Sequence, residues 1–205
     1  MAGRTTMAAV PLTTGIVLFE EAEELDYAGP WEVFTMARKE GDRVVTVAES
    51  VAPVRSAKGL RVIPDCSFDD APPLDVLVVP GGQGTRREVD NQALLAWLRE
   101  AAAACTWVTS VCTGAFLLHA AGLTRDRRVT THWGSIERLR ERGGITVLDD
   151  VRYVRDGNVV SAAGVSAGID MSLWVVGQLY SPDHARVVQR FMEYDPAPPY
   201  AAAVE

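Results

Sequence analysis

The chain has 205 residues, of which 48% are hydrophobic and 23% are charged, as is typical of a single globular domain with a sizeable core. The formal net charge is −7, and the Lys and Arg residues form no basic stripe, so we do not expect nucleic acid as a partner. No apolar run approaches the roughly 20 residues of a membrane-spanning helix, so we do not expect a membrane partner. The 3 cysteines lack CxxC or other metal-type spacing, so we expect reduced thiols and no metal.

The ends of the chain differ from its middle. Residues 1–13 lack a long apolar core, and we expect them to form a disordered leader rather than a signal peptide. We accordingly expect a cytoplasmic protein. No linker, repeat or low-complexity tract interrupts residues 14–200, so we predict one domain there, followed by a tail at 201–205.

Apolar β-branched segments alternate with helical patterns along the chain. In chain order, the patterns predict a strand at 15–19, a helix that begins with Pro30, a strand at 44–48, two short strands within 51–64, a strand at 75–79, a helix at 91–104, a strand at 105–111, a helix at 113–121, a strand at 128–131, a helix at 134–142, a hairpin of 151–155 with 159–162, and helices at 166–180 and 182–192. Because this alternation places parallel strands between two helical layers, we predict an α/β fold with a doubly wound, mostly parallel sheet.

Arginines cluster in two places after the middle of the chain. Arg127-Arg128 and the set Arg138, Arg140 and Arg142 have acidic residues nearby in sequence, at 126, 137 and 141. We therefore expect both clusters to belong to solvated faces of mixed charge.

The predicted strand 105–111 ends at Cys112, and a helical pattern starts at once. A sharp turn of this kind lifts the side chain above the sheet, much as the G-x-S-x-G motif presents a serine, although Ser110 replaces the first glycine. Unpaired N–H groups at a helix start also favour a thiolate. Cys112 is thus either a nucleophile or a buried cysteine that packs as a small hydrophobic residue.

Three segments far apart in sequence follow predicted strands. Asp26, the pair Gly81-Gly82 and Cys112 each come after a strand, and ligands of open α/β sheets bind beyond the carboxyl ends of the strands. We expect these residues to share one site. The alternative for Asp26 is to cap the N-terminus of the helix that begins near Pro30.

Five segments in this order resemble the DJ-1/PfpI superfamily. They are 25–34 (LDYAGPWEVF), 79–82 (VPGG), 110–115 (SVCTGA), 130–133 (TTHW) and 166–170 (SAGID). The resemblance covers residues 14–200 and implies a glutamine-amidotransferase-like, flavodoxin-like fold and a homodimer without a cofactor. The aspartate at 26, the threonine after the cysteine and the ending 193–200 (EYDPAPPY) are most similar to the isonitrile hydratases, which add water to an isocyanide to give an N-substituted formamide.

The resemblance implies a role for each site residue. Cys112 would attack the isonitrile carbon to form a thioimidate, and Asp26 would act as general acid and base. If Asp26 lies beside the thiolate in an apolar pocket, its pKa would rise and keep it protonated. Thr113, with the backbone around Gly81 and Gly82, would stabilise the developing charge.

The segment 130–133 carries two further candidates for substrate binding. His132 and Trp133 would border the pocket, with a structural histidine and aromatic core packing as the alternatives.

One departure from the wider superfamily sharpens this hypothesis. The related proteases have histidine directly after the cysteine, where this chain has Thr113, so the resemblance does not extend to peptidase activity. Other functions left open are a free-standing ligand-binding domain like the sensor half of AraC-type regulators, a glyoxalase or deglycase, and redox sensing by an exposed Cys112 of low pKa.

Overall fold

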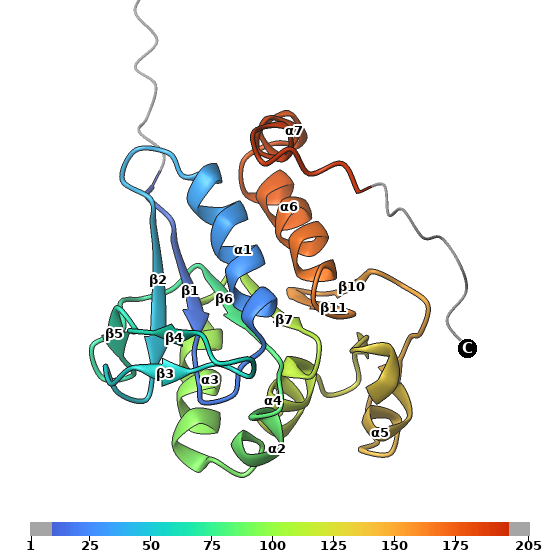
Figure 1. The fold of residues 1–205 in the computed structure, drawn as a ribbon. Helices are drawn as coiled ribbons and strands as arrows, with labels where there is room; N and C mark the ends of the chain where they lie inside the picture. Colours follow the sequence, from blue (N-terminus) through green and yellow to red (C-terminus); the bar gives the residue numbers. More distant parts are fainter. Residues whose placement is uncertain (1–9, 197–205) are drawn as a thin grey trace, which may run out of the picture.

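The computed structural model describes residues 10–196, and a seven-stranded sheet runs through its centre (Figure 1). The strand order is β10-β11-β7-β6-β1-β2-β5, and only β10 is antiparallel to its neighbour. The strand bounds are β1 Thr13–Val17, β2 Arg43–Ala48, β5 Cys66–Ser67, β6 Val76–Val79, β7 Trp107–Val111, β10 Tyr153–Asp156 and β11 Val159–Ala162. The predicted doubly wound, flavodoxin-like fold is confirmed.

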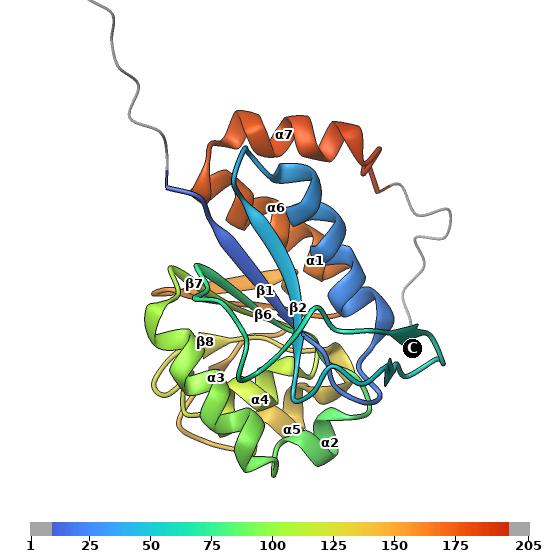
Figure 2. The same ribbon diagram turned by 90° about the vertical axis from the view of Figure 1, so that its left-hand side faces the viewer.

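Helices cover both faces of this sheet, as Figures 1 and 2 show. One layer holds α1 Glu24–Ala37, α6 Ala167–Leu179 and α7 Pro182–Phe191, which pack on one another. The opposite layer holds α2 Thr85–Glu88, α3 Gln92–Ala104 and α4 Gly114–Ala120. None of the helices within residues 10–196 is both long and apolar enough to cross a membrane.

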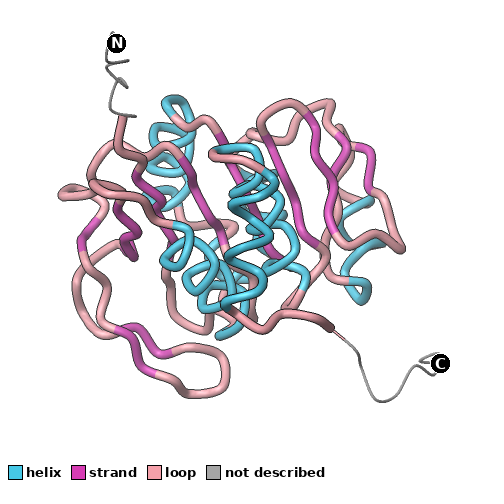
Figure 3. Tube along the Cα trace, turned by 90° about the horizontal axis from the view of Figure 1, so that it is seen from above, coloured by secondary structure: helices cyan, strands magenta, loops and turns pink. Residues whose placement is uncertain are grey.

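Two small sheets and a short helical segment complete the fold. The antiparallel pair β3 Val54–Arg55 and β4 Arg61–Val62 projects from the body in the view from above (Figure 3). The parallel pair β8 Arg128–Val129 and β9 Thr146–Val147 flanks the 3-10 turn η1 Trp133–Ser135 and α5 Ile136–Arg140. A separate apolar cluster beneath α5 includes Phe116, Ile136 and Leu139.

The core follows from the burial of the central strands on both faces. Every residue of β6 is buried, as expected for an inner parallel strand that is apolar throughout. In β7 only Trp107 retains partial exposure. The carboxyl ends of these two strands therefore sit on a densely packed base.

Two local predictions were wrong. The first helix begins at Glu24 rather than near Pro30, because Pro30 tolerates helical φ and lies inside the helix, where the prediction used it as a start signal. Asp26 consequently lies in the first turn, and Glu23 occupies the cap position. The first strand spans Thr13–Val17 rather than the predicted 15–19. Strand β5, which contains Cys66, extends the sheet by pairing with Val47 and its neighbour.

The predicted leader and tail mostly fall outside the described part of the chain. Residues 1–9 and 197–205 are not described, and β1 begins at Thr13. The prediction for the tail at 201–205 therefore lies outside the described residues.

Truncation of a central core side chain tests this packing. Leu77 of β6 is 0% exposed, so Leu77→Ala should lower the free energy of unfolding by about 2–5 kcal/mol through lost burial and a residual cavity. Leu60, which is 53% exposed, provides the matched control, and Leu60→Ala should change stability by less than about 0.5 kcal/mol. Urea unfolding of the two variants measures both values, and equal losses would contradict the assigned burial.

Candidate active site

Cys112 occupies the sharp turn between β7 and α4. Its φ of 56° lies in the left-handed region, which few residues other than glycine adopt. The turn is held on both sides: the Cys112 N–H donates to the Ala162 carbonyl at 3.1 Å, and the Thr131 hydroxyl donates to the Cys112 carbonyl at 2.7 Å. A Cβ at Gly114 would lie 2.2 Å from the Val79 carbonyl oxygen, so the turn requires glycine there. The strand-to-helix turn predicted from the sequence is therefore present.

The Asp26 carboxyl group is buried within the same region, with 0% exposure. Its Oδ2 accepts the Gly81 N–H at 2.8 Å, and its Oδ1 accepts the Val165 N–H at 3.1 Å. The Cys112 side chain lies close enough to this carboxyl group that each influences the pKa of the other. The structure thus brings together Asp26, Gly81 and Cys112, the three segments that the strand-end argument placed at one site.

Val165 is a site residue that the sequence analysis missed. It follows β11, and its φ of 47° is rare for a β-branched residue. Such backbone strain costs on the order of 1–3 kcal/mol and persists where surrounding contacts hold it, here the bond to Asp26. Only its position could have pointed to Val165 in the sequence, because β11 ends at the same sheet edge as β6 and β7.

Burial sets the proton affinities of the two reactive groups. Desolvation raises the pKa of Asp26 to about 7, and the charge of Glu23 adds to the rise against the bonds from Gly81 and Val165. Desolvation together with the Asp26 charge raises the pKa of Cys112 to about 12, against hydrogen bonds from Thr113. Below about pH 7 both groups are therefore protonated, and above it the pair holds a single proton, which resides on sulfur.

The expectation of an exposed thiol of low pKa was wrong. Cys112 is only 8% exposed. The helix whose N-terminus was expected to favour a thiolate, α4, is only 7 residues long. Desolvation beside a carboxylate outweighs the hydrogen bonds that favour the thiolate. The thiolate is accordingly favoured only when the proton resides on Asp26.

Thr113 and the glycine pair form a connected network next to Cys112. The Gly82 N–H donates to the Thr113 hydroxyl oxygen at 3.0 Å, and the Thr85 hydroxyl lies 3.0 Å from the same oxygen. The N–H groups of Gly81 and Gly82, both predicted as oxyanion donors, thus already have acceptors within the protein. A Cβ at Gly81 would lie 2.5 Å from the Thr113 nitrogen, so this network leaves room only for glycine.

His132 and Trp133 lie farther out. His132 Nδ1 accepts the Gly134 N–H and so caps the short helix η1, while Trp133 is 78% exposed rather than packed in the core. Both residues line a groove of about 700 Å³ that also touches Thr131 and Val165. The groove therefore adjoins Cys112 and Asp26, because Thr131 hydrogen-bonds the Cys112 carbonyl and the Val165 N–H donates to Asp26.

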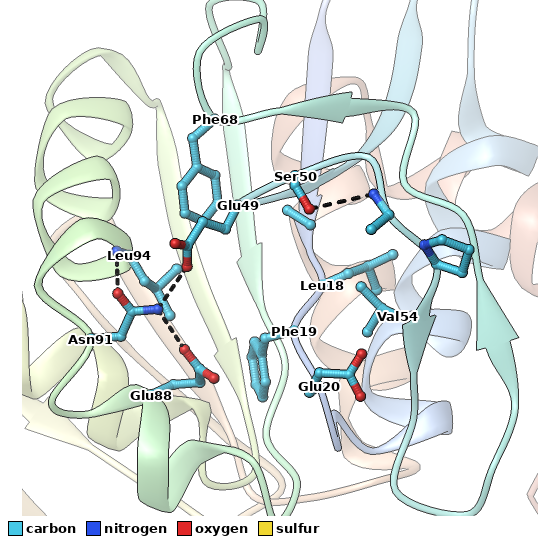
Figure 4. Close-up of a pocket in the computed structure, with 13 residues that line it drawn as sticks. Leu18, Phe19, Glu20, Glu49, Ser50, Val54, Phe68, Glu88, Asn91 and Leu94 are labelled. Atoms are coloured by element: carbon cyan, nitrogen blue, oxygen red, sulfur yellow. Dashed lines mark hydrogen bonds between the residues drawn. The ribbon is translucent and has the colours of Figure 1, made fainter.

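A different cavity, of about 370 Å³, opens near the ends of β1 and β2 (Figure 4). Its carboxylates have internal partners: the Asn91 amide donates to Glu49 and Glu88, and the Arg55 N–H donates to Glu20. Neither reactive group lines it. Within residues 10–196, no three His, Cys, Asp or Glu side chains gather in a way that could hold a metal ion.

The pH dependence of thiol alkylation tests the coupling of the pair. Above about pH 7 the Asp26 charge opposes ionisation of Cys112, so Asp26→Asn should lower the thiol pKa. At about pH 8.5 iodoacetamide should then modify Cys112 faster, by about tenfold for each unit that the pKa falls. At about pH 5.5, where Asp26 is protonated, the difference should shrink.

Chymotryptic cleavage after Trp107 places Cys105 and Cys112 on different peptides, so mass spectrometry of the digest separates Cys112 from Cys66 and Cys105. Asp90→Asn makes the same chemical change at an exposed aspartate and should leave the rate unaltered. Unchanged or slower alkylation of Cys112 in Asp26→Asn at the higher pH would contradict the electrostatic coupling.

Comparisons with known proteins identify the family of this chain. The model of the DJ-1/PfpI family matches residues 14–178. An isonitrile hydratase of Pseudomonas putida is 41% identical over 189 residues, which cover 92% of this chain and 81% of that protein. The transcriptional regulator GbdR of Pseudomonas aeruginosa strain UCBPP-PA14 is 24% identical over 90% of this chain and 51% of the regulator. A crystal structure of a ThiJ/PfpI family protein from Pseudomonas syringae superposes with a TM-score of 0.88 at 33% identity, covering 95% of this chain and 80% of that chain. The chain belongs to the DJ-1/PfpI family.

Proposed function

We propose that the protein is an isonitrile hydratase, a lyase that converts an isocyanide and water into an N-substituted formamide. The observation that carries this proposal is the fully buried Asp26 carboxyl group beside Cys112, close enough for its charge to raise the pKa of the thiol. The reaction needs a sulfur nucleophile and an acid that can give and recover a proton, and this pair supplies both. The 41% identity to the Pseudomonas putida hydratase supports the same substrate class.

The first half of the proposed mechanism forms a thioimidate. The Cys112 thiol first passes its proton to the Asp26 carboxylate. The resulting thiolate attacks the terminal carbon of the isonitrile and forms a carbon–sulfur bond. The lone pair of that carbon takes the proton from Asp26, which leaves a neutral R–N=CH–S–Cys112 adduct and an Asp26 carboxylate. A pKa of about 7 allows Asp26 to hold and release this proton near neutral pH.

The second half releases the product. Water adds across the carbon–nitrogen double bond, with its hydroxyl on carbon and its proton relayed through Asp26 to nitrogen. The tetrahedral adduct then loses its hydroxyl proton to Asp26 as the carbon–sulfur bond breaks. The products are R–NH–CHO, the Cys112 thiolate and protonated Asp26, which is the state that attacks the isonitrile.

Other residues position these two groups in the proposal. Thr113, which directly follows the nucleophile, lowers the pKa of the Cys112 thiol and so favours its ionised form. The backbone at Gly81 and Gly82 fixes Asp26 and Thr113. His132 and Trp133 line the groove that adjoins the pair, and in the proposal this groove holds the substrate. A homodimer in the cytoplasm belongs to the same proposal and rests on the family resemblance.

A second candidate function is a ligand-binding domain. The similarity to GbdR, described as an HTH-type transcriptional regulator, favours it, although the identity is 24% against 41% for the hydratase. The two functions differ in one measurable respect, because a sensor binds its ligand reversibly whereas a hydratase turns it over.

Turnover of 4-nitrophenyl isocyanide tests the proposal. The wild-type protein should form N-(4-nitrophenyl)formamide, measured by chromatography with mass spectrometry. Cys112→Ala should form no detectable product because the nucleophile is gone. Asp26→Asn should lose at least about 10²-fold in kcat, the contribution expected of a general acid and base.

Two matched substitutions serve as controls. Cys105→Ala removes another buried thiol, and Asp90→Asn removes an exposed carboxylate; both should keep wild-type turnover. Absence of product from wild type across several aryl and alkyl isocyanides would overturn the proposed activity. Turnover that survives Cys112→Ala would overturn the mechanism alone.

A further inference from the structure

Three arginine side chains converge on a small cavity on the helical face opposite α1. Arg86 of α2, Arg138 of α5 and Arg142 just beyond α5 line a pocket of about 260 Å³. Its other lining residues are Thr85, Val89 and Phe116, so no acidic side chain contributes to the lining. The arginines thus concentrate positive charge in a pocket whose lining contains no Asp or Glu.

The guanidinium groups of these arginines form no ion pair within residues 10–196, unlike their neighbour Arg140. Arg140 pairs with Glu137 and with Asp149, the latter at 2.9 Å. Arg138 and Arg142 instead lie over the Phe116 ring, at 4.8 Å and 5.9 Å from its centroid. The expected solvated face of mixed charge is confirmed for Arg140, whereas Arg138 and Arg142 remain at least partly exposed but lie over the ring without an acidic partner.

Clustering like charges in this way is unfavourable on its own. Desolvation and the charges of Arg86 and Arg142 lower the pKa of Arg138. Desolvation, together with the charge of Arg142, lowers the pKa of His119 on the neighbouring α4. Yet the chain as a whole carries a net charge of −7, so carboxylates were available to neutralise the cluster. Mutual repulsion that the protein leaves uncompensated would be relieved by an anion in the pocket.

We propose that this pocket binds the phosphate group of a small molecule. Three guanidinium groups from separate positions match a tetrahedral group with several charged oxygens, because each arginine can donate two N–H bonds in a planar fork. Phe116 holds two of the forks against its ring, which limits their freedom before the ligand arrives. The small volume restricts the bound part of the ligand to little more than the phosphate itself.

The pocket lies beside the candidate active site but is separate from it. The Thr85 hydroxyl lies 3.0 Å from the Thr113 hydroxyl, and Thr113 follows Cys112. Neither Asp26 nor Cys112 lines the pocket. The phosphate site can therefore be tested by binding alone, whatever reaction Cys112 performs.

Calorimetric titration at constant ionic strength provides the test, with inorganic phosphate, phenyl phosphate and benzoate as probes. Both phosphates should bind the wild-type protein saturably, with Kd below about 10 mM, and benzoate should bind at least about tenfold more weakly. Arg138→Gln and Arg142→Gln should each weaken phosphate binding about tenfold. Arg99→Gln removes the same charge from an exposed position outside the pocket lining and should leave the Kd unchanged.

Circular dichroism establishes that each variant is folded before titration. Tighter binding of phenyl phosphate than of inorganic phosphate would identify a phosphate ester as the ligand, and the reverse order would identify free phosphate. The proposal fails if neither phosphate binds, if benzoate binds as tightly, or if Arg99→Gln weakens binding as much as Arg138→Gln.

Discussion

The hydrogen bonding of one buried carboxyl group organises this structure. Asp26 accepts main-chain N–H groups from two loops, at Gly81 after β6 and at Val165 after β11, while itself belonging to α1. A buried carboxylate without partners would cost several kcal/mol, and hydrogen bonds to a charged group offset about 1.5–3 kcal/mol each. The part of the desolvation cost that these hydrogen bonds do not offset raises the pKa of Asp26. A raised pKa is the property that general acid and base catalysis requires.

The sheet topology supplies these loops, and backbone strain gives them their shape. Cys112, Val165 and Gly82 all have positive φ, and all three follow strands that end at the same edge of the sheet. Two of them carry side chains that disfavour this conformation. The packed strands β6, β7 and β11 hold the turns in place, so the stability of the core maintains a geometry that the loops would not adopt by themselves.

The sequence predicted the parts of this arrangement that depend on local pattern. A β-branched run ending at Cys112, the glycines at 81 and 82, and the alternation of strands and helices sufficed for the fold and for most of the site. The position of Asp26 inside α1 was missed because Pro30 was interpreted as a helix start. Val165 was missed because its contribution is a backbone N–H, which any residue except proline provides, to a partner 139 positions away. The unpaired arginines were missed because their acidic neighbours in sequence suggested ion pairs, whereas in the structure Arg138 and Arg142 lie over the Phe116 ring.

Both hydrogen-bond donors to Asp26 are main-chain N–H groups, and this affects which positions of the site can vary. Val165 supplies its N–H from the main chain, while its side chain lines the groove that adjoins the reactive pair. Replacing that side chain would reshape the groove and leave the bond to the carboxyl group in place. Substrate preference and proton affinity are thus separable at this position, so that evolution or a designer can vary the first while conserving the second. Gly81 cannot be varied in this way, because atoms of Thr113 and Asp26 already occupy the space that a side chain at this position would need.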